Sequence, residues 1–138
     1  MQISILSNLK LDDAKEFEIL DPLTGKRSQT YNPKTKKLED SPAFISLFYM
    51  GSKKMKKVQL ELQRKIIELA KEKKDAPTEK EVEDMLFFEM IDSYRGFKDD
   101  KGKELEFNEE NTRLLLEAPY IRHLIEEVSS KMGNFSTK

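Results

Sequence analysis

The 138-residue sequence contains no cysteine, no tryptophan and a single histidine, His123. The lack of cysteine excludes disulfide bonds, thiolate metal sites and cysteine nucleophiles, and it fits a reducing compartment. A histidine-based catalytic triad would have to use His123, and no Gly-x-Ser-x-Gly sequence is present to position a nucleophile. We therefore expect a protein that is not an enzyme and that needs no cofactor and no metal.

The chain also lacks long apolar runs and an excess of either sign of charge. Its hydrophobic and charged fractions are both 37%, and its formal net charge is -1. No apolar stretch is long enough to span a membrane, and no basic region precedes an apolar run at the N-terminus as in a signal peptide. We expect a single soluble, intracellular domain over residues 1-138, with a thin core and no overall attraction to membranes or nucleic acid.

The densest set of apolar and aromatic residues lies between Val82 and Phe97. At helical spacing these residues cover more than one side, which predicts a central helix over residues 78-95 with several packing neighbours. Thr78 and Glu81 have the spacing of a capping box at the start of this helix, and Gly96 follows its end.

A long helix is expected over residues 42-74, because Asp40-Ser41-Pro42 is a strong helix start. Apolar residues then recur in one narrow stripe at intervals of about 100°. A break at Gly51 is the alternative, since glycine lowers helix propensity by about 1 kcal/mol relative to alanine. The stripe residues that we expect to pack on the central helix are Phe44, Phe48, Val58, Leu62 and Ile66.

The sequence pattern of the N-terminal region indicates β-structure. Residues 16-20 alternate and run into the turn sequence Asp21-Pro22-Leu23-Thr24-Gly25, and a second turn follows at residues 32-35. We expect a small antiparallel ribbon over residues 16-39 that leans on the helices, because such a ribbon is marginally stable alone.

The C-terminal region predicts a turn and two further helices. Asp99-Asp100-Lys101-Gly102 is a turn sequence, so residues 97-107 should form a short hairpin. Asn108 is a candidate N-cap and Pro119 can begin a new helix, which predicts helices within residues 109-132. The predicted fold class is mainly α: a small helical domain with an N-terminal β-hairpin or short ribbon, and one long helix packed on a central helix.

The acidic turn does not match a calcium loop. An EF-hand needs oxygen ligands at loop positions 1, 3 and 5, with glycine at position 6. Counted from Asp99, Lys101 and Lys103 occupy positions 3 and 5, and Gly102 falls at the wrong place. We interpret this segment as a solvated turn.

A basic cluster is formed by Lys53, Lys54, Lys56 and Lys57. Residues 53-75 contain nine basic and four acidic residues, whereas residues 76-128 contain seven basic and fifteen acidic residues. The cluster lacks the aromatic residues that would stack on bases, so we do not expect nucleic acid as a partner. We expect this basic cluster to form a solvated face or to contact an acidic protein surface.

A set of positions after Asp92 resembles a known family. These positions are Tyr94, the acidic turn with Gly102, the Leu105-x-Phe107 pair, Glu110-Asn111, Leu115-Leu116, and Pro119-Tyr120-Ile121-Arg122. They resemble the C-terminal half of the small tail assembly chaperones of long-tailed bacteriophages and prophages. Upstream, residues 21-25 are similar to the early hairpin turn of that family, and residues 40-44 are similar to the entry into its first long helix.

The resemblance implies a non-catalytic protein of the host cytoplasm. It would bind the long, helical tape measure protein, help to recruit the major tail (tube) protein, and be absent from the mature virion. Self-association is left open. Two other functions also stay open: a virion structural protein or head-tail or tail connector, and a helical adaptor protein of the host cell.

For the partner-binding surface, we predict residues that the main apolar stripe does not use. Leu60 and Ile67 form a minor second stripe on the long helix, next to the basic cluster. The alternative that these two are scattered surface residues stays open. The predicted partner-binding residues are Lys53, Lys54, Lys56, Lys57, Leu60 and Ile67.

Overall fold

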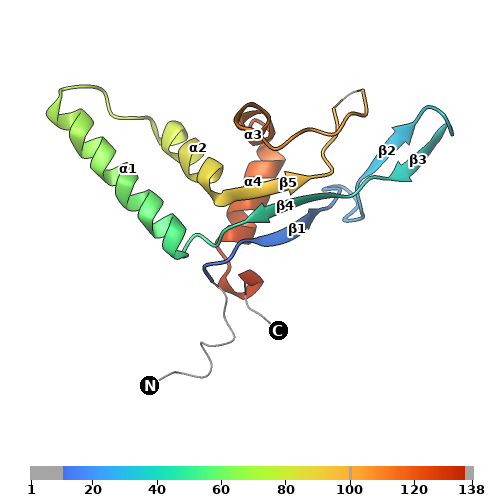
Figure 1. Cartoon of the computed structure of the whole chain (residues 1–138), viewed down its shortest axis with the longest axis horizontal. Helices are drawn as coiled ribbons and strands as arrows, with labels where there is room; N and C mark the ends of the chain where they lie inside the picture. Colours follow the sequence, from blue (N-terminus) through green and yellow to red (C-terminus); the bar gives the residue numbers. More distant parts are fainter. Residues whose placement is uncertain (1–10, 100, 136–138) are drawn as a thin grey trace, which may run out of the picture.

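The computed structural model describes residues 11-99 and 101-135, and their fold is mixed α/β, not mainly α as expected. An antiparallel sheet in the order β1-β4-β5 lies at the centre, and β2 and β3 form a separate hairpin (Figure 1). The strands are β1 (Lys15–Ile19), β2 (Gln29–Asn32), β3 (Lys37–Asp40), β4 (Ala43–Leu47) and β5 (Ile91–Arg95). The helices are α1 (Lys53–Lys71), α2 (Glu79–Met90), α3 (Glu109–Leu116), α4 (Pro119–Ser129) and the 3-10 turn η2 (Met132–Phe135).

The prediction of one helix over residues 42-74 is wrong. Residues 43-47 form β4, which pairs with β1 on one side and with β5 on the other. The helix begins only at Lys53, where the buried Ser52 hydroxyl accepts a hydrogen bond from the Met55 amide at 3.3 Å. The alternative break at Gly51 is close to this boundary, but the segment before it is a strand. Phe44 therefore lies in a strand and not on the expected stripe.

The central helix is shorter than expected. Thr78 caps α2 as predicted, since its hydroxyl accepts a hydrogen bond from the Glu81 amide at 3.2 Å. The helix ends at Met90, and the chain continues directly into β5. Gly96 thus ends a strand and not a helix.

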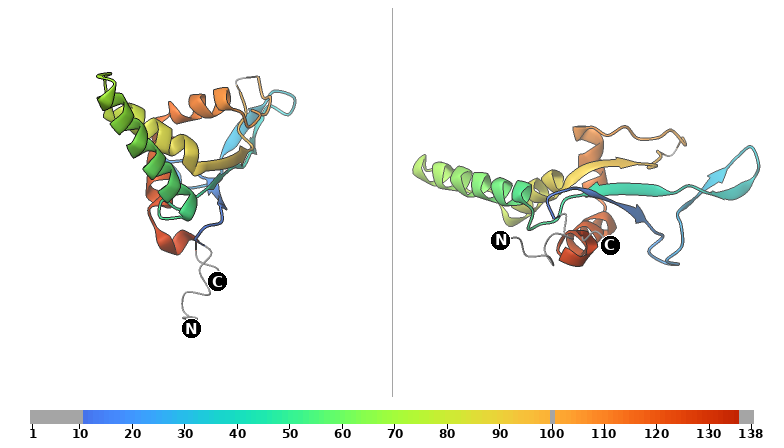
Figure 2. Two further views of the ribbon diagram at one scale, coloured as in Figure 1. Left: turned by 60° about the vertical axis from the view of Figure 1, so that its left-hand side comes forward. Right: turned by 60° about the horizontal axis from the view of Figure 1, so that its bottom comes forward.

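β4 is the centre of the core. Its residues alternate between buried and half-buried, with Ile45 and Leu47 fully enclosed. α4 crosses one face of the sheet and adds Ile121 and Ile125 to the same apolar cluster (Figure 2). The buried cluster joins sheet and helices in one core and also contains Ile19, Ala43, Met55, Phe87, Met90, Ile91, Tyr94 and Leu116.

The predicted ribbon over residues 16-39 is replaced by two separate pairings. β1 pairs with β4 and not with the next segment, apart from one bridge between Leu20 and Arg27. The turn at residues 21-25 is present, with the Gly25 amide bonded to the Asp21 carbonyl at 2.8 Å. β2 and β3 pair around the second predicted turn, and their hairpin extends away from the helices (Figure 1).

The C-terminal predictions agree with the structure more closely. The Leu105 amide donates to the Phe97 carbonyl at 2.7 Å, and Lys98 forms a bridge with Glu104, so the two arms of the expected hairpin pair. Asp100, in the predicted turn, lies outside the described residues. The Asn108 side chain caps α3 by accepting a hydrogen bond from the Asn111 amide at 2.8 Å. Pro119 stands at the start of α4.

Candidate functional site

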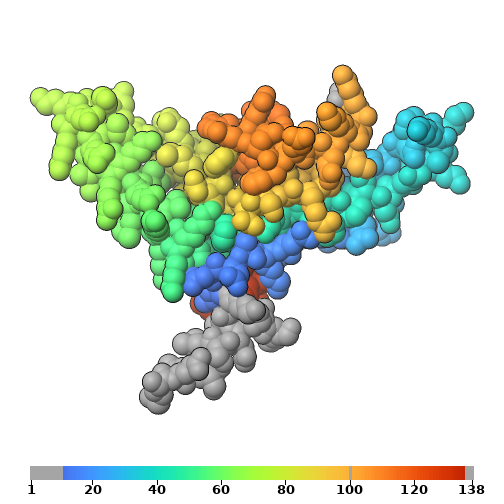
Figure 3. Space-filling view, in the orientation of Figure 1, coloured from blue at the N-terminus to red at the C-terminus, as the bar shows by residue number. Residues whose placement is uncertain are grey.

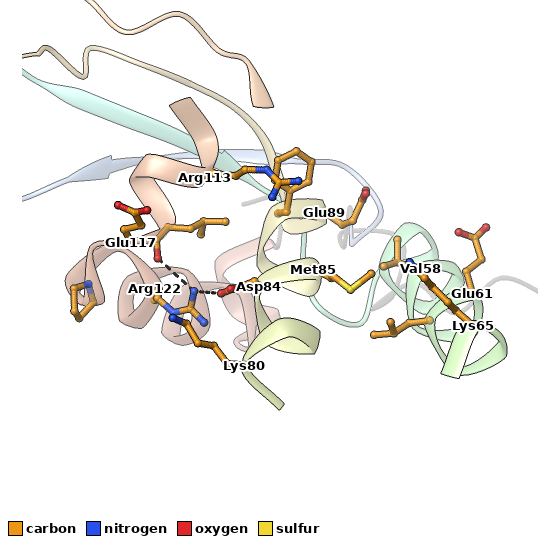
Figure 4. Close-up of a pocket in the computed structure, with 14 residues that line it drawn as sticks. Val58, Glu61, Lys65, Lys80, Asp84, Met85, Glu89, Arg113, Glu117 and Arg122 are labelled. Carbon is orange, nitrogen blue, oxygen red and sulfur yellow. Dashed lines mark hydrogen bonds and ion pairs between the residues drawn. The ribbon is translucent and has the colours of Figure 1, made fainter. Parts of the chain in front are cut away.

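A groove with a volume of about 1030 Å³ lies over α2 (Figure 4). α2 contributes its floor, α1 forms one wall, and α3 and α4 form the other. The residues that line it are Val58, Glu61, Leu62, Lys65, Lys80, Asp84, Met85, Phe88, Glu89, Arg113, Leu116, Glu117, Pro119 and Arg122.

The groove exists because α1 is anchored at one end only. Met55, in the first turn of α1, is fully buried, whereas Leu62 and Ile66 are only half-buried and most other residues of the helix are exposed. The loop over residues 72-78 joins the end of α1 to the start of α2 (Figure 1). α1 does contact α2 as expected, and Val58 packs against the core. The expectation that Leu62 and Ile66 are buried in that core is wrong.

Apolar side chains lie along the middle of the groove. Met85 is 37% exposed and points toward α1 between the two helices (Figure 4). Phe88 and Val58 are half-buried, and Leu116 closes the wall on the α3 side. Met85, Phe88 and Val58 can contact a ligand, since the groove leaves them partly open to solvent.

Arg122 holds the α4 wall against α2. Its guanidinium contacts the Asp84 carboxylate, bonds Glu83 at 2.9 Å and the Leu116 carbonyl at 3.3 Å, and stacks on the Phe87 ring at 4.9 Å. Partial burial opposes the charged form, but the hydrogen bonds that Arg122 donates to Asp84 and Glu83, with the negative charge of both carboxylates, outweigh it and raise the pKa of Arg122. The wall is thus fixed by a permanently charged guanidinium.

Charges of both signs stand around the apolar middle. Glu61 and Lys65 come from α1 and Lys80 comes from α2, and none of the three has an ion-pair partner within residues 11-99 and 101-135. Such a rim suits a partner helix that carries one apolar stripe between charged flanks.

The predicted basic cluster divides into two parts. Lys54 donates to the Glu89 carbonyl at 2.8 Å and lies 4.2 Å from the centre of the Phe48 ring, so it connects α1 to α2. Lys53 bonds Asp12 through its backbone amide at 2.8 Å. Lys56 and Lys57 are exposed and have no ion pair in the part of the chain that the structure describes. These last two remain available to a partner.

Leu60 and Ile67 are both 55% exposed. Neither lines the groove, because at about 100° per residue they face the side of α1 opposite Val58 and Leu62. α1 therefore has two distinct surfaces, the groove wall and a back surface formed by Leu60 and Ile67.

Sequence reasoning missed the groove because it assigned the apolar residues of α1 and α2 to the core. One signal was present: apolar residues in the central stretch cover more than one side of the helix, and Met85 and Phe88 belong to the side that the groove leaves open. The helical pattern reports which residues avoid water, but not how far apart two helices stand.

Within 11-99 and 101-135, no group of three or more His, Cys, Asp and Glu side chains is placed to hold a metal ion. In the same ranges no helix has the length and apolar character that crossing a membrane requires.

Searches of protein-family models, curated proteins and solved structures found no significant match to this chain.

Proposed function

We propose that this chain is a tail assembly chaperone of a long-tailed phage or prophage, which binds an amphipathic helix of the tape measure protein in the groove over α2. It acts by stoichiometric binding, without catalysis, in the host cytoplasm, and it helps to bring tail tube subunits to the bound tape measure. The observation that carries the proposal is the row of partly exposed apolar side chains between α1 and α2, flanked by charges.

The physical need for such a groove follows from the partner. A long amphipathic helix that is not yet covered by tube subunits exposes its apolar stripe and aggregates. A groove with apolar residues in its middle can cover part of that stripe, while the charges of its rim remain in water. Val58, Leu62, Met85 and Phe88 supply the apolar contact here.

The residues that resemble the chaperone family support the proposal through their place in the fold. Tyr94 packs edge-on against Phe97 and Phe107, with ring centres 5.7 and 5.1 Å apart, and its hydroxyl lies 3.1 Å from that of Thr112 in α3. These contacts hold α3 in position, and Arg122 holds α4. The resembling residues therefore build the second wall of the groove.

Co-expression with the cognate tape measure protein tests the proposal. The tape measure should move from the insoluble to the soluble fraction and co-purify with this chain, without added nucleotide. Met85→Glu places a charge in the groove and should abolish co-purification. Met132→Glu is the matched control, because Met132 is 48% exposed outside the groove, and it should have no effect.

A second pair of variants separates the groove from the surface predicted from sequence. Leu60→Glu with Ile67→Glu changes the back surface of α1, and Lys56→Glu with Lys57→Glu changes the free part of the basic cluster. If these variants abolish binding and Met85→Glu does not, the partner binds the back of α1. If the tape measure stays insoluble with every form of this chain, and the chain is found in purified virions by mass spectrometry, the connector function replaces the chaperone.

A further inference from the structure

The hairpin of β2 and β3 projects from one end of the molecule and has a free outer edge (Figures 1 and 3). All four residues of β3 are exposed, and the strand pairs only with β2 within the described chain. A two-stranded ribbon without a covering layer is marginally stable, and an exposed strand edge is a template for pairing with another strand.

The backbone of β3 presents unpaired amide and carbonyl groups at its free edge, as the alternation of hydrogen-bonded pairs with β2 shows. The Ser41 amide donates to the Ser28 carbonyl at 2.8 Å, one step beyond the Gln29-Asp40 pair. Hydrogen-bonded and non-hydrogen-bonded pairs alternate along an antiparallel ladder. Leu38, opposite Tyr31, is therefore in a non-hydrogen-bonded pair, and its amide and carbonyl point to the free edge.

The charges along β3 would match those of a second β3 placed antiparallel to it. The segment Lys36-Lys37-Leu38-Glu39-Asp40 carries two positive charges before the leucine and two negative charges after it. In the described chain neither lysine has an ion pair, and the two carboxylates accept hydrogen bonds only from the neutral side chains of Gln29, Asn32 and Thr35. The edge of β2, formed by Gln29, Thr30, Tyr31 and Asn32, has no such charge pattern.

We propose that β3 pairs with β3 of a second copy of this chain around a two-fold axis at Leu38. Antiparallel pairing in this register lets the two Leu38 residues exchange backbone hydrogen bonds. It sets Lys37 opposite the second copy's Glu39 and Lys36 next to the second copy's Asp40. The two hairpins become one four-stranded sheet.

The same register joins the exposed apolar residues of the hairpin. Tyr31 and Leu38 are 61% and 64% exposed, and they share one face because they are directly opposite each other. In the dimer, the row Tyr31-Leu38 of one copy continues into Leu38-Tyr31 of the other, which covers part of this apolar surface. The interface is short, so the dimer is weak and depends on concentration.

Sedimentation equilibrium with a pair of charge variants tests the proposal. Lys36→Glu with Lys37→Glu makes the edge wholly acidic, and Glu39→Lys with Asp40→Lys makes it wholly basic. Each variant alone should dimerise at least about tenfold more weakly than the wild type, since four attractive pairs become repulsive. An equimolar mixture of the two variants should restore dimerisation, because every pair is then attractive again.

The control is Lys56→Glu with Lys57→Glu, which makes the same change of charge on α1. This helix lies on the other side of the sheet from the β2-β3 hairpin (Figure 1), so the control should dimerise like the wild type. All variants should keep the wild-type melting temperature, because the hairpin lies outside the core. Wild-type protein that remains monomeric into the millimolar range would overturn the proposal. So would variants that dimerise like the wild type, or a mixture of folded variants that stays monomeric.

Discussion

Gly96 shows how a single residue joins two elements that are distant in the sequence. Its backbone has φ of +84°, and a Cβ placed there would overlap the Pro42 carbonyl oxygen and lie 3.0 Å from the Ala43 Cα. β5 can therefore leave the sheet beside β4 only because this residue has no side chain. The overlapping atoms belong to the backbone, so a small side-chain movement cannot relieve the clash.

Gly102 provides a matched comparison. Its φ is +81°, but a Cβ there would meet nothing within 4 Å. Gly102→Ala should cost about 1 to 2 kcal/mol of folding free energy through its backbone conformation alone. Gly96→Ala should cost at least about 2 kcal/mol more, because the clash is added. Urea unfolding monitored by circular dichroism measures both, and equal costs would show that the close approach of Pro42 is not maintained.

At the scale of one element, α1 is buried in the core only at its first turn, through Met55, and the rest of the helix is half-buried or exposed. Met55→Ala should destabilise the protein by about 2 to 5 kcal/mol, as a fully buried large-to-small substitution does. Leu62→Ala should cost about 1 kcal/mol, because Leu62 is only half-buried at the groove. Leu60→Ala, on the back surface, should stay within about 0.5 kcal/mol of the wild type.

The difference between Met55 and Leu62 reports whether the groove is open in solution. If Leu62→Ala costs as much as Met55→Ala, then α1 closes onto α2 and the groove over α2 is not available to a partner. Equilibrium unfolding in urea gives the three values under one set of conditions.

At the scale of the whole molecule, α1 and α2, which line the groove, lie on one side of the sheet, and the β2-β3 hairpin projects from the other (Figure 1). A partner in the groove and a second copy on β3 therefore do not compete for the same residues. A dimer formed through β3 would present two grooves to one long partner, and such bivalent attachment strengthens binding without new contacts.

Hydrogen exchange should separate these regions. We expect the slowest amide exchange in β4 and α4, which carry the most enclosed residues, and the fastest in β2, β3 and the last turns of α1. Raising the protein concentration should slow exchange in β3 alone. Adding a tape measure segment should slow it in α1 and α2, whereas slowing confined to other elements would place the binding surface elsewhere.

The features that sequence alone determined are local. The cap at Thr78, the cap at Asn108, the helix start at Pro119 and the turn around Gly102 each depend on contacts within a few residues. Each cap or turn is formed by a side-chain oxygen or a fixed φ, and the residue that supplies it lies within a few positions of the backbone groups that it stabilises. For that reason these predictions are confirmed.

Tertiary structure alone decided between helix and strand for β4 and β5. Residues 43-47 and 91-95 are five residues long, so periods of 2 and 3.6 both fit their apolar positions. The choice depends on whether a partner strand lies alongside, and β4 finds its partners in β1 and β5, which are distant in the sequence. The candidate site depends on the same level of structure. Apolar positions on α1 and α2 are visible in the sequence. The space that leaves Leu62, Met85 and Phe88 lining a groove depends on how the helices pack on the sheet and on one another.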